Sequence, residues 1–315
     1  MSAKRRQPPR PESASIDHAE PRQAVTVESM LCVLERMAAA AGIDSPEALD
    51  AFYDSVSEEQ FERAQAAWIA TGPRAHAQHL AYQAMLDARS DQEAESLARR
   101  ALELDPQCVD AMVVLAELTA EDRVGEFITR VEEAVETARR CLPADWVWWQ
   151  FEAQPYLRAR HRLADALRVL GRADEARLHF EALLEADAED HRRVREPLLC
   201  CYLVQEDLES ARALLDRFDG DASAVFPWGR VLERLLAGCP DAAEAALRPA
   251  RRQNRYVEPY LAFNQAPPAS KPERYEPGSR EEAVHCVYIL GPAWAAHSDA
   301  ILWLRSQSHH RRGRS

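Results

Sequence analysis

A pair of amphipathic helices joined by a short glycine turn constrains the fold of this chain more than any other feature. Residues 157–188 have the sequence LRARHRLADALRVLGRADEARLHFEALLEADA, with the turn at Gly171-Arg172-Ala173. Apolar side chains recur at helical spacing on both sides of the turn, at Leu163, Ala164 and Leu167 and then at Ala176, Phe180 and Leu183. One such hairpin cannot bury both of its apolar faces, so the pattern predicts further hairpins packed on each side of it.

The second helix of this hairpin has counterparts along the chain. Its small residue, Ala176, is followed by Ala211 and Ala245 at intervals of 35 and 34 residues. Upstream, an alanine stripe precedes a helix ending of the form Glu-Leu-Asp-Pro, at Ala94, Ala98, Ala101 and residues 103–106. This period is that of tetratricopeptide repeats, which are helix–turn–helix units of about 34 residues. The sequence therefore predicts an all-α fold of tetratricopeptide-like antiparallel helical hairpins stacked in a right-handed solenoid, with an ordinary helical bundle as the alternative.

The rest of the chain divides into segments of different composition. Residues 1–24 are rich in Pro, Arg and Glu and lack an apolar period, which predicts a disordered leader. Residues 25–72 predict an N-terminal helical cap, and residues 73–255 the tetratricopeptide-like array. Prolines predict a Pro-rich crossing followed by C-terminal capping helices over residues 256–305, ahead of a basic tail at 306–315.

Prolines also bound the helices expected inside these segments. We expect helices at about 109–118 and 124–142, between Pro106 and Pro155. Ser45 followed by Pro46 predicts a helix start in the N-terminal cap. Pro197 predicts a kink unless it falls in the first turn of its helix.

Composition and charge predict a cytoplasmic protein that does not bind nucleic acid. The chain has 315 residues and a formal net charge of −13 at pH 7, and an acidic surface repels phosphate. No segment approaches the ~18 apolar residues of a transmembrane helix, and the N-terminal residues lack the apolar core of a secretory signal. The seven cysteines include no Cys-x-x-Cys pair, which indicates buried reduced thiols.

Motifs of catalysis are scarce. The chain lacks a Gly-x-Gly-x-x-Gly sequence, a phosphate-binding loop and a Gly-x-Ser-x-Gly elbow, so we expect no cofactor and a non-catalytic protein. His76 and His79 lie one helical turn apart and could supply two bonds to a metal, but acidic ligands at matching spacing are missing. A metal-dependent hydrolase with a site at His76/His79 or near residues 146–151 is the alternative function.

Three tryptophans lie close together after Pro143, at Trp146, Trp148 and Trp149. They either fill the junction next to the long helix expected at 124–142 or form an aromatic hot spot for a partner. We expect them to fill the junction, and exposure of Trp148 or Trp149 would favour the hot spot.

The first helices of stacked hairpins line a concave surface, which gives a candidate groove. The residues expected to face it are Arg158, His161, Asp165, Arg168, Arg193, Glu196, Arg230 and Arg234. Guanidinium forks bind carboxylates, so the predicted partner is an acidic peptide or another carboxylate-bearing protein segment. The alternative is that these arginines pair with acidic neighbours such as Asp165 and Glu196. An open end of a solenoid also makes a homodimer possible.

Short sequences within residues 151–304 carry a family resemblance. They are AQPYLRAR at 153–160, LADALRVLGRADEARLHFEALL at 163–184, LLDRFDGDAS at 214–223, VEPYL at 257–261, YEPGSREEA at 275–283 and AILWL at 300–304. Their order resembles bacterial tetratricopeptide proteins related to the suppressor of tumorigenicity seven family. The resemblance implies a tetratricopeptide array that acts in protein interaction or scaffolding, without catalytic residues. The turn Asp187-Ala188-Glu189-Asp190 departs from the family pattern.

Overall fold

The computed structural model describes residues 22–43, 45–119, 124–272 and 274–312. Every regular element in these ranges is helical, so the all-α prediction is confirmed. Most of the predicted leader, residues 1–21, lies outside the described residues. The elements are α1 (Arg22–Ala41), α2 (Pro46–Ser55), α3 (Glu58–Ile69), α4 (Pro73–Leu86), α5 (Asp91–Leu104), α6 (Val109–Leu118), α7 (Val124–Cys141), η2 (Phe151–Ala153), α8 (Gln154–Val169), α9 (Ala173–Ala186), α10 (Arg195–Val204), α11 (Leu208–Arg217), α12 (Val225–Leu236), α13 (Pro240–Gln253), α14 (Val257–Leu261), α15 (Arg280–Ala296) and α16 (Ser298–Arg312).

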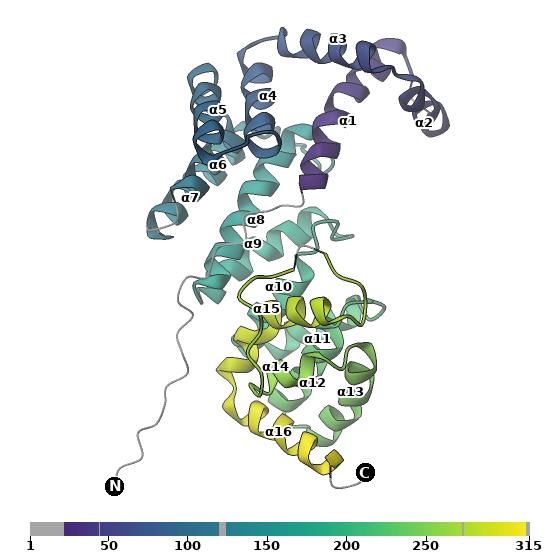
Figure 1. Cartoon of the computed structure of the whole chain (residues 1–315), viewed down its shortest axis with the longest axis vertical. Coiled ribbons are helices and arrows are strands. Elements are labelled where there is room, and N and C mark those ends of the chain that lie inside the picture. Colours follow the sequence, from purple (N-terminus) through teal and green to yellow (C-terminus); the bar gives the residue numbers. More distant parts are fainter. Residues whose placement is uncertain (1–21, 44, 120–123, 273, 313–315) are drawn as a thin grey trace.

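Consecutive helices pack as pairs along an elongated molecule (Figure 1). The pairs within residues 73–255 are α4–α5, α6–α7, α8–α9, α10–α11 and α12–α13. The first helices of neighbouring pairs also contact one another, from α4 to α6, α6 to α8, α8 to α10 and α10 to α12. Side chains on a first helix therefore meet side chains from the preceding and following pairs.

The second helices of the pairs bury their side chains in a common register. In α5, α9, α11 and α13, the residue four positions after the N-cap is a buried alanine. The residue eight positions after the N-cap is also buried. These residues are Ala94 and Ala98, Ala176 and Phe180, Ala211 and Leu215, and Ala243 and Leu247. Because residues four apart share one helix face, each second helix presents the same stripe to its neighbours.

The repeat position in α13 is Ala243, so the prediction of Ala245 was wrong. Ala243 is fully buried, whereas Ala245 is exposed. The interval from Ala211 is shorter than expected because α13 already begins at Pro240, directly after the turn at Gly238. Several alanines lie close together in this helix, so the spacing of small residues does not show which of them is buried.

Three of the turns inside the pairs use a residue in the left-handed conformation. Gly171, Glu206 and Gly238 have φ angles of 77°, 56° and 70°. In the first of these turns the N–H of Arg172 donates to the carbonyl of Leu167 at 2.9 Å, and the other two turns repeat this bond. This is the Schellman arrangement that ends many helices, usually at glycine. Glu206 adopts it without being glycine, which explains why only two of the three turns are visible in the sequence.

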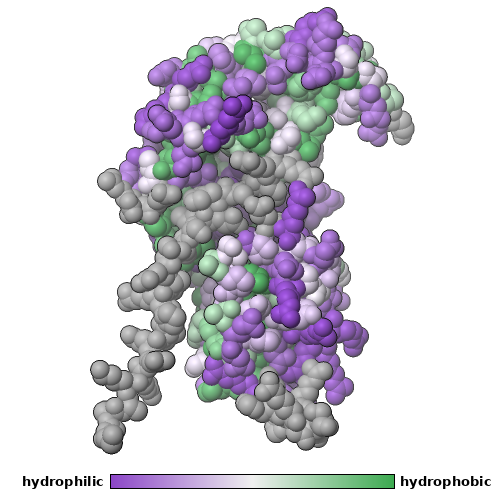
Figure 2. All heavy atoms as spheres, viewed as in Figure 1, coloured by the Kyte–Doolittle hydropathy of each residue, from purple (hydrophilic) through white to green (hydrophobic). Residues whose placement is uncertain are grey.

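Helices α1 to α3 precede the pairs, and α1 exposes apolar residues to solvent. Ser45 caps α2 with Pro46 as its first residue, as predicted. Hydrophobic residues lie on the surface of α1 on the face shown in Figure 2. Val27 and Met30 of this helix are each 48% exposed. None of the described helices combines the length and the apolar character needed to cross a membrane.

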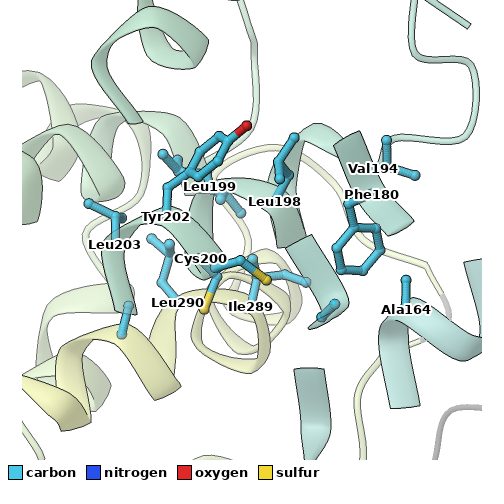
Figure 3. Close-up of a cluster of buried hydrophobic side chains, with 14 of the residues drawn as sticks. Ala164, Phe180, Val194, Leu198, Leu199, Cys200, Tyr202, Leu203, Ile289 and Leu290 are labelled. Carbon is cyan, nitrogen blue, oxygen red and sulfur yellow. The ribbon is translucent and has the colours of Figure 1, made fainter. Parts of the chain in front are cut away.

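Helix α10 is enclosed by its neighbours and lies in a large cluster of buried side chains (Figure 3). It contacts α9 on one side and α15 on the other, where Ile289 and Leu290 pack into the cluster. Helix α12 comes close to it at Gly229, where an added Cβ would lie 2.6 Å from Cδ2 of Leu199. Pro197 is the third residue of α10, so it occupies the first turn and does not kink the helix.

The C-terminal segment covers the last helix pairs. Helix α14 has only five residues, and the described residues between it and α15 form no longer helix, as the prolines predict. Helix α15 contacts α10, α12 and α14, and α16 contacts α12 and α15. Helix α16 continues to Arg312, so the segment expected to be a basic tail begins inside this helix.

Candidate functional site

Most of the arginines predicted to line a groove form ion pairs with carboxylates near them in the chain. Arg168 lies 2.7 Å from Asp165, and Arg193 lies 2.7 Å from Glu196. The other two pairs of this kind are Arg230 with Asp216 and Asp219, at 2.9 and 3.2 Å, and Arg234 with Glu233, at 3.3 Å. His161 packs edge-on against Phe180 with ring centroids 6.1 Å apart. The ion pairs that the sequence left open as the alternative are therefore present.

Arg158 is buried and joins three helices. Its Nε and Nη2 donate to the two carboxylate oxygens of Asp110 on α6, at 2.8 and 2.7 Å. Its Nη1 and Nη2 donate to Glu28 on α1, at 2.5 and 3.1 Å. Tyr82 and Gln78 of α4 complete the cluster by donating to Glu28 and Asp110, both at 2.7 Å. One guanidinium thus holds two carboxylates and ties α1 to the first helices α4, α6 and α8.

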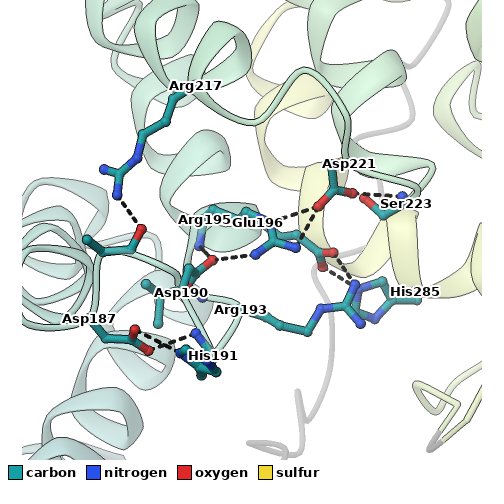
Figure 4. Close-up of polar contacts among 12 residues, drawn as sticks. Asp187, Asp190, His191, Arg193, Arg195, Glu196, Arg217, Asp221, Ser223 and His285 are labelled. Carbon is teal, nitrogen blue, oxygen red and sulfur yellow. Dashed lines mark hydrogen bonds and ion pairs between the residues drawn. The ribbon is translucent and has the colours of Figure 1, made fainter. Parts of the chain in front are cut away.

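Glu196 is the centre of a second buried cluster (Figure 4). Nε2 of His285 lies 2.7 Å from one of its oxygens, and Arg193 donates to the other at 2.7 Å. Arg193 also donates to the hydroxyl of Tyr275 at 3.2 Å. Burial raises the pKa of Glu196, but the hydrogen bonds from His285 and Arg193 outweigh it and lower the pKa to about 2. Glu196 therefore stays ionised at neutral pH and links α10 to α15.

The turn Asp187-Ala188-Glu189-Asp190 is part of a helix-capping network (Figure 4). Asp190 accepts hydrogen bonds from the backbone N–H groups of Val194 and Arg195, at 2.7 and 3.0 Å. The Arg195 side chain then bridges Asp190 and Asp221, at 3.1 and 2.7 Å. These bonds satisfy the first N–H groups of α10, which a helix start leaves without partners in its own turn.

The three tryptophans differ in how far they are buried. Trp146 and Trp148 are partly buried and pack against the core. Trp148 stacks on His191 with ring centroids 4.4 Å apart, and a hydrogen bond to Asp187 raises the pKa of His191. Trp149 is 63% exposed. The exposed ring meets the condition set above for an aromatic hot spot, while the other two fill the junction.

The two histidines considered for a metal lie on α4 without a third ligand. His79 packs edge-on against Trp68 with centroids 6.4 Å apart. Burial lowers the pKa of His79, and the neighbouring His76 lowers it further. In the ranges that the structure describes, no group of three or more His, Cys, Asp or Glu residues could hold a metal ion.

The cysteines are unpaired, and most are buried as predicted. Cys32, Cys108, Cys200, Cys201 and Cys286 are buried. The expectation was wrong for Cys239, which is exposed because it lies at the N-cap of α13. Cys141, at the end of α7, is partly buried.

A cleft beside α1 was not foreseen from the sequence. Its volume is about 340 Å³, and its walls come from α1, α3, α4, the start of α6, the end of α7 and the start of α8. Arg36 and Arg74 line it, together with the carboxylates of Asp105 and Glu152. Aromatic rings form much of the remaining wall, from Trp68, Tyr82, Phe151 and Tyr156. These residues are far apart in the sequence, and no motif joins them.

No protein-family profile and no curated protein matches this chain. The resemblance to the suppressor of tumorigenicity seven family therefore stays a prediction.

Proposed function

We propose that this chain is a non-catalytic interaction protein of the helical-repeat kind, which holds a carboxylate-bearing segment of a partner protein. In this proposal the pairs α4–α5 to α12–α13 are tetratricopeptide-like hairpins stacked in a right-handed solenoid. The common register of buried residues in α5, α9, α11 and α13 supports this arrangement. The acidic net charge favours a protein partner over a nucleic acid, and a cytoplasmic protein remains the expectation.

The observation that carries the proposal is the ion pair between Glu28 and Arg158. Here a carboxylate presented by α1 is held by a guanidinium fork on α8, the first helix of its pair. Such bidentate contacts between arginine and carboxylate are strong and specific in geometry. The chain thus contains, within itself, the mode of recognition that we propose for a partner.

The proposal does not rest on the row of arginines expected from the sequence. Arg168, Arg193, Arg230 and Arg234 already have carboxylates at ion-pair distance. A partner that bound there would have to replace these carboxylates, and the net gain would be small. Binding is more favourable where a guanidinium has no such partner.

A peptide selection tests the proposed function. The purified full chain is immobilised and offered a display library of short random peptides with free C-termini. We expect the selected peptides to be enriched in Asp and Glu, or to lose binding when their C-terminus is amidated, and their binding to weaken as salt is raised, because ion pairs are screened. A selection that returns no binders, or binders without a preference for carboxylates, would reject the proposal.

A further inference from the structure

We infer that the cleft beside α1 binds the C-terminal residue of a partner protein, through its free carboxylate and an aromatic side chain. This inference rests on the proposed function and names the site at which it would act. A volume of about 340 Å³ lies within the range of ligand-binding pockets and suits a single residue better than a helix.

Arg36 is held in place with part of its guanidinium unused. Its Nη1 donates to the carbonyl oxygen of Cys32 at 2.5 Å and to the sulfur of the same residue at 2.9 Å. The guanidinium lies over the ring of Trp68, 5.5 Å from the ring centroid. Within the described residues, Nε and Nη2 have no acceptor. A guanidinium fixed in this way can bind a carboxylate without first losing much rotational freedom.

Arg74 provides a second guanidinium on the same cleft. It is exposed near the start of α4, and no carboxylate of the described residues lies within ion-pair distance of it. The lack of a paired carboxylate distinguishes Arg36 and Arg74 from Arg158 and the other arginines predicted to face a groove. A ligand carboxylate can reach both without displacing a carboxylate of the chain.

The walls of the cleft explain why the carboxylate should belong to a residue with an aromatic side chain. Trp68 and Tyr82 are largely buried and form one part of the lining, while Phe151 and Tyr156 form another. Because the Arg36 guanidinium lies on the Trp68 ring itself, the anion and the apolar part of a ligand must be close neighbours. A C-terminal residue meets this need, since its carboxylate and side chain share one Cα atom.

The carboxylates in the lining restrict the charge of the ligand. Oδ1 of Asp105 accepts a hydrogen bond from the N–H of Gln107 at 2.9 Å, and Glu152 is exposed. With Arg36 and Arg74, these two residues leave the lining with no formal net charge. A carboxylate with a single negative charge therefore fits this site better than a phosphate with two. Replacing Glu152 by a neutral residue should improve binding.

The probe for the cleft is a fluorescein-labelled peptide, Gly-Ser-Gly-Ser-Trp, with a free C-terminal carboxylate, and the control peptide is its C-terminal amide. Binding to the full chain is measured by fluorescence anisotropy. We expect the acid to bind about tenfold more tightly than the amide, and Arg36→Gln and Arg74→Gln each to weaken binding of the acid about tenfold. Glu152→Gln should tighten it about threefold. Arg99→Gln, in an exposed ion pair on α5, is the matched control and should change nothing.

Each outcome decides for or against the cleft. Equal binding of acid and amide, no binding of either, or full binding to Arg36→Gln and Arg74→Gln would overturn the inference. Thermal melting of each variant shows whether it is folded, and the gain expected for Glu152→Gln cannot arise from unfolding. If the peptide selection returns acidic binders that these variants still hold, the proposed function stands and the cleft is the wrong site.

Discussion

Buried charges in this chain are compensated residue by residue. A buried carboxylate is costly unless it is paired and hydrogen-bonded. Glu196 meets this condition through His285 and Arg193. Asp190 accepts hydrogen bonds from two backbone N–H groups and pairs with Arg195, but burial outweighs these contacts and raises its pKa. These contacts make the two carboxylates parts of the folded structure, and the stability of the chain should therefore depend on their ionisation.

Glu196 should make the stability of the chain depend on acid pH. Its pKa is about 2 in the folded chain against an ordinary value of 4.5, so the unfolded chain takes up a proton first as the pH falls. The contribution of Glu196 is fully present above pH 4.5 and is lost as the pH falls towards 2. Urea unfolding at pH 7 and pH 3 measures it, and the loss due to this residue should be at most about 3 kcal/mol.

The variant Glu196→Gln separates this effect from general acid unfolding. It should be less stable than the wild type at pH 7 and should lose less stability between pH 7 and pH 3. Glu59→Gln removes an exposed carboxylate from α3 and should behave like the wild type. Equal losses in wild type and Glu196→Gln would show that Glu196 does not have the lowered pKa.

At the scale of the residue, the sequence identified charged side chains that form ion pairs, but it did not identify all of their partners. Arg193 and Glu196 were both expected at the groove, and they do contact each other, although Arg193 lies in the turn before α10 and not on the helix. Their third partner, His285, is distant in the sequence and no pattern joins it to them. For Arg158 a signal existed, because Asp110 is the only charged residue before Glu117 in the apolar helix expected at 109–118. A lone carboxylate on such a helix indicates a buried ion pair.

The helix is the scale at which the repeat is defined. Helices α5, α9, α11 and α13 share one register, but the lengths of the turns and first helices differ, so the interval along the chain is not constant. The spacing of similar residues along the sequence therefore predicts that these helices exist. It is a less reliable guide to which residue each helix buries. Ala245 shows the limit, since the buried alanine of α13 lies two positions earlier.

Enlarging each of the two alanines of α13 tests the register. Ala243→Leu should destabilise the chain by about 1–3 kcal/mol, because the added side chain has no space in a close-packed core. Ala245→Leu adds the same atoms at an exposed position and should change the free energy of unfolding by less than about 0.5 kcal/mol. Urea unfolding measures both variants. The reverse order of the two effects would mean that Ala245 is the repeat position after all.

At the scale of the whole molecule, the buried side chains of the described residues form three separate clusters. A large one extends from α6 and α7 to α16, and a second joins α4, α5 and α6. The third is the cluster that holds α1, and it is small: its buried members are Val25, Cys32, Val33, Trp68 and Tyr82, with partly buried hydrophobic residues packed around them. The polar contacts that hold α1 include the ion pair of Glu28 with Arg158 and the hydrogen bond that Tyr82 donates to Glu28. The structure therefore joins the N-terminal helix to the array by a contact that one substitution can weaken.

Glu28→Gln should loosen α1 and leave the helix pairs folded. The substitution keeps the shape of the side chain but removes the charge that Arg158 binds, while Asp110 still pairs with the guanidinium. Hydrogen exchange followed by mass spectrometry should show faster exchange in residues 22–41, with α8 to α12 unchanged. Arg158→Met should be far more harmful, at about 3–5 kcal/mol, because it leaves two buried carboxylates without a cation. If Glu28→Gln instead accelerates exchange equally in every helix, then α1 and the array unfold as one unit, and the cleft that α1 helps to form cannot open separately from the rest of the molecule.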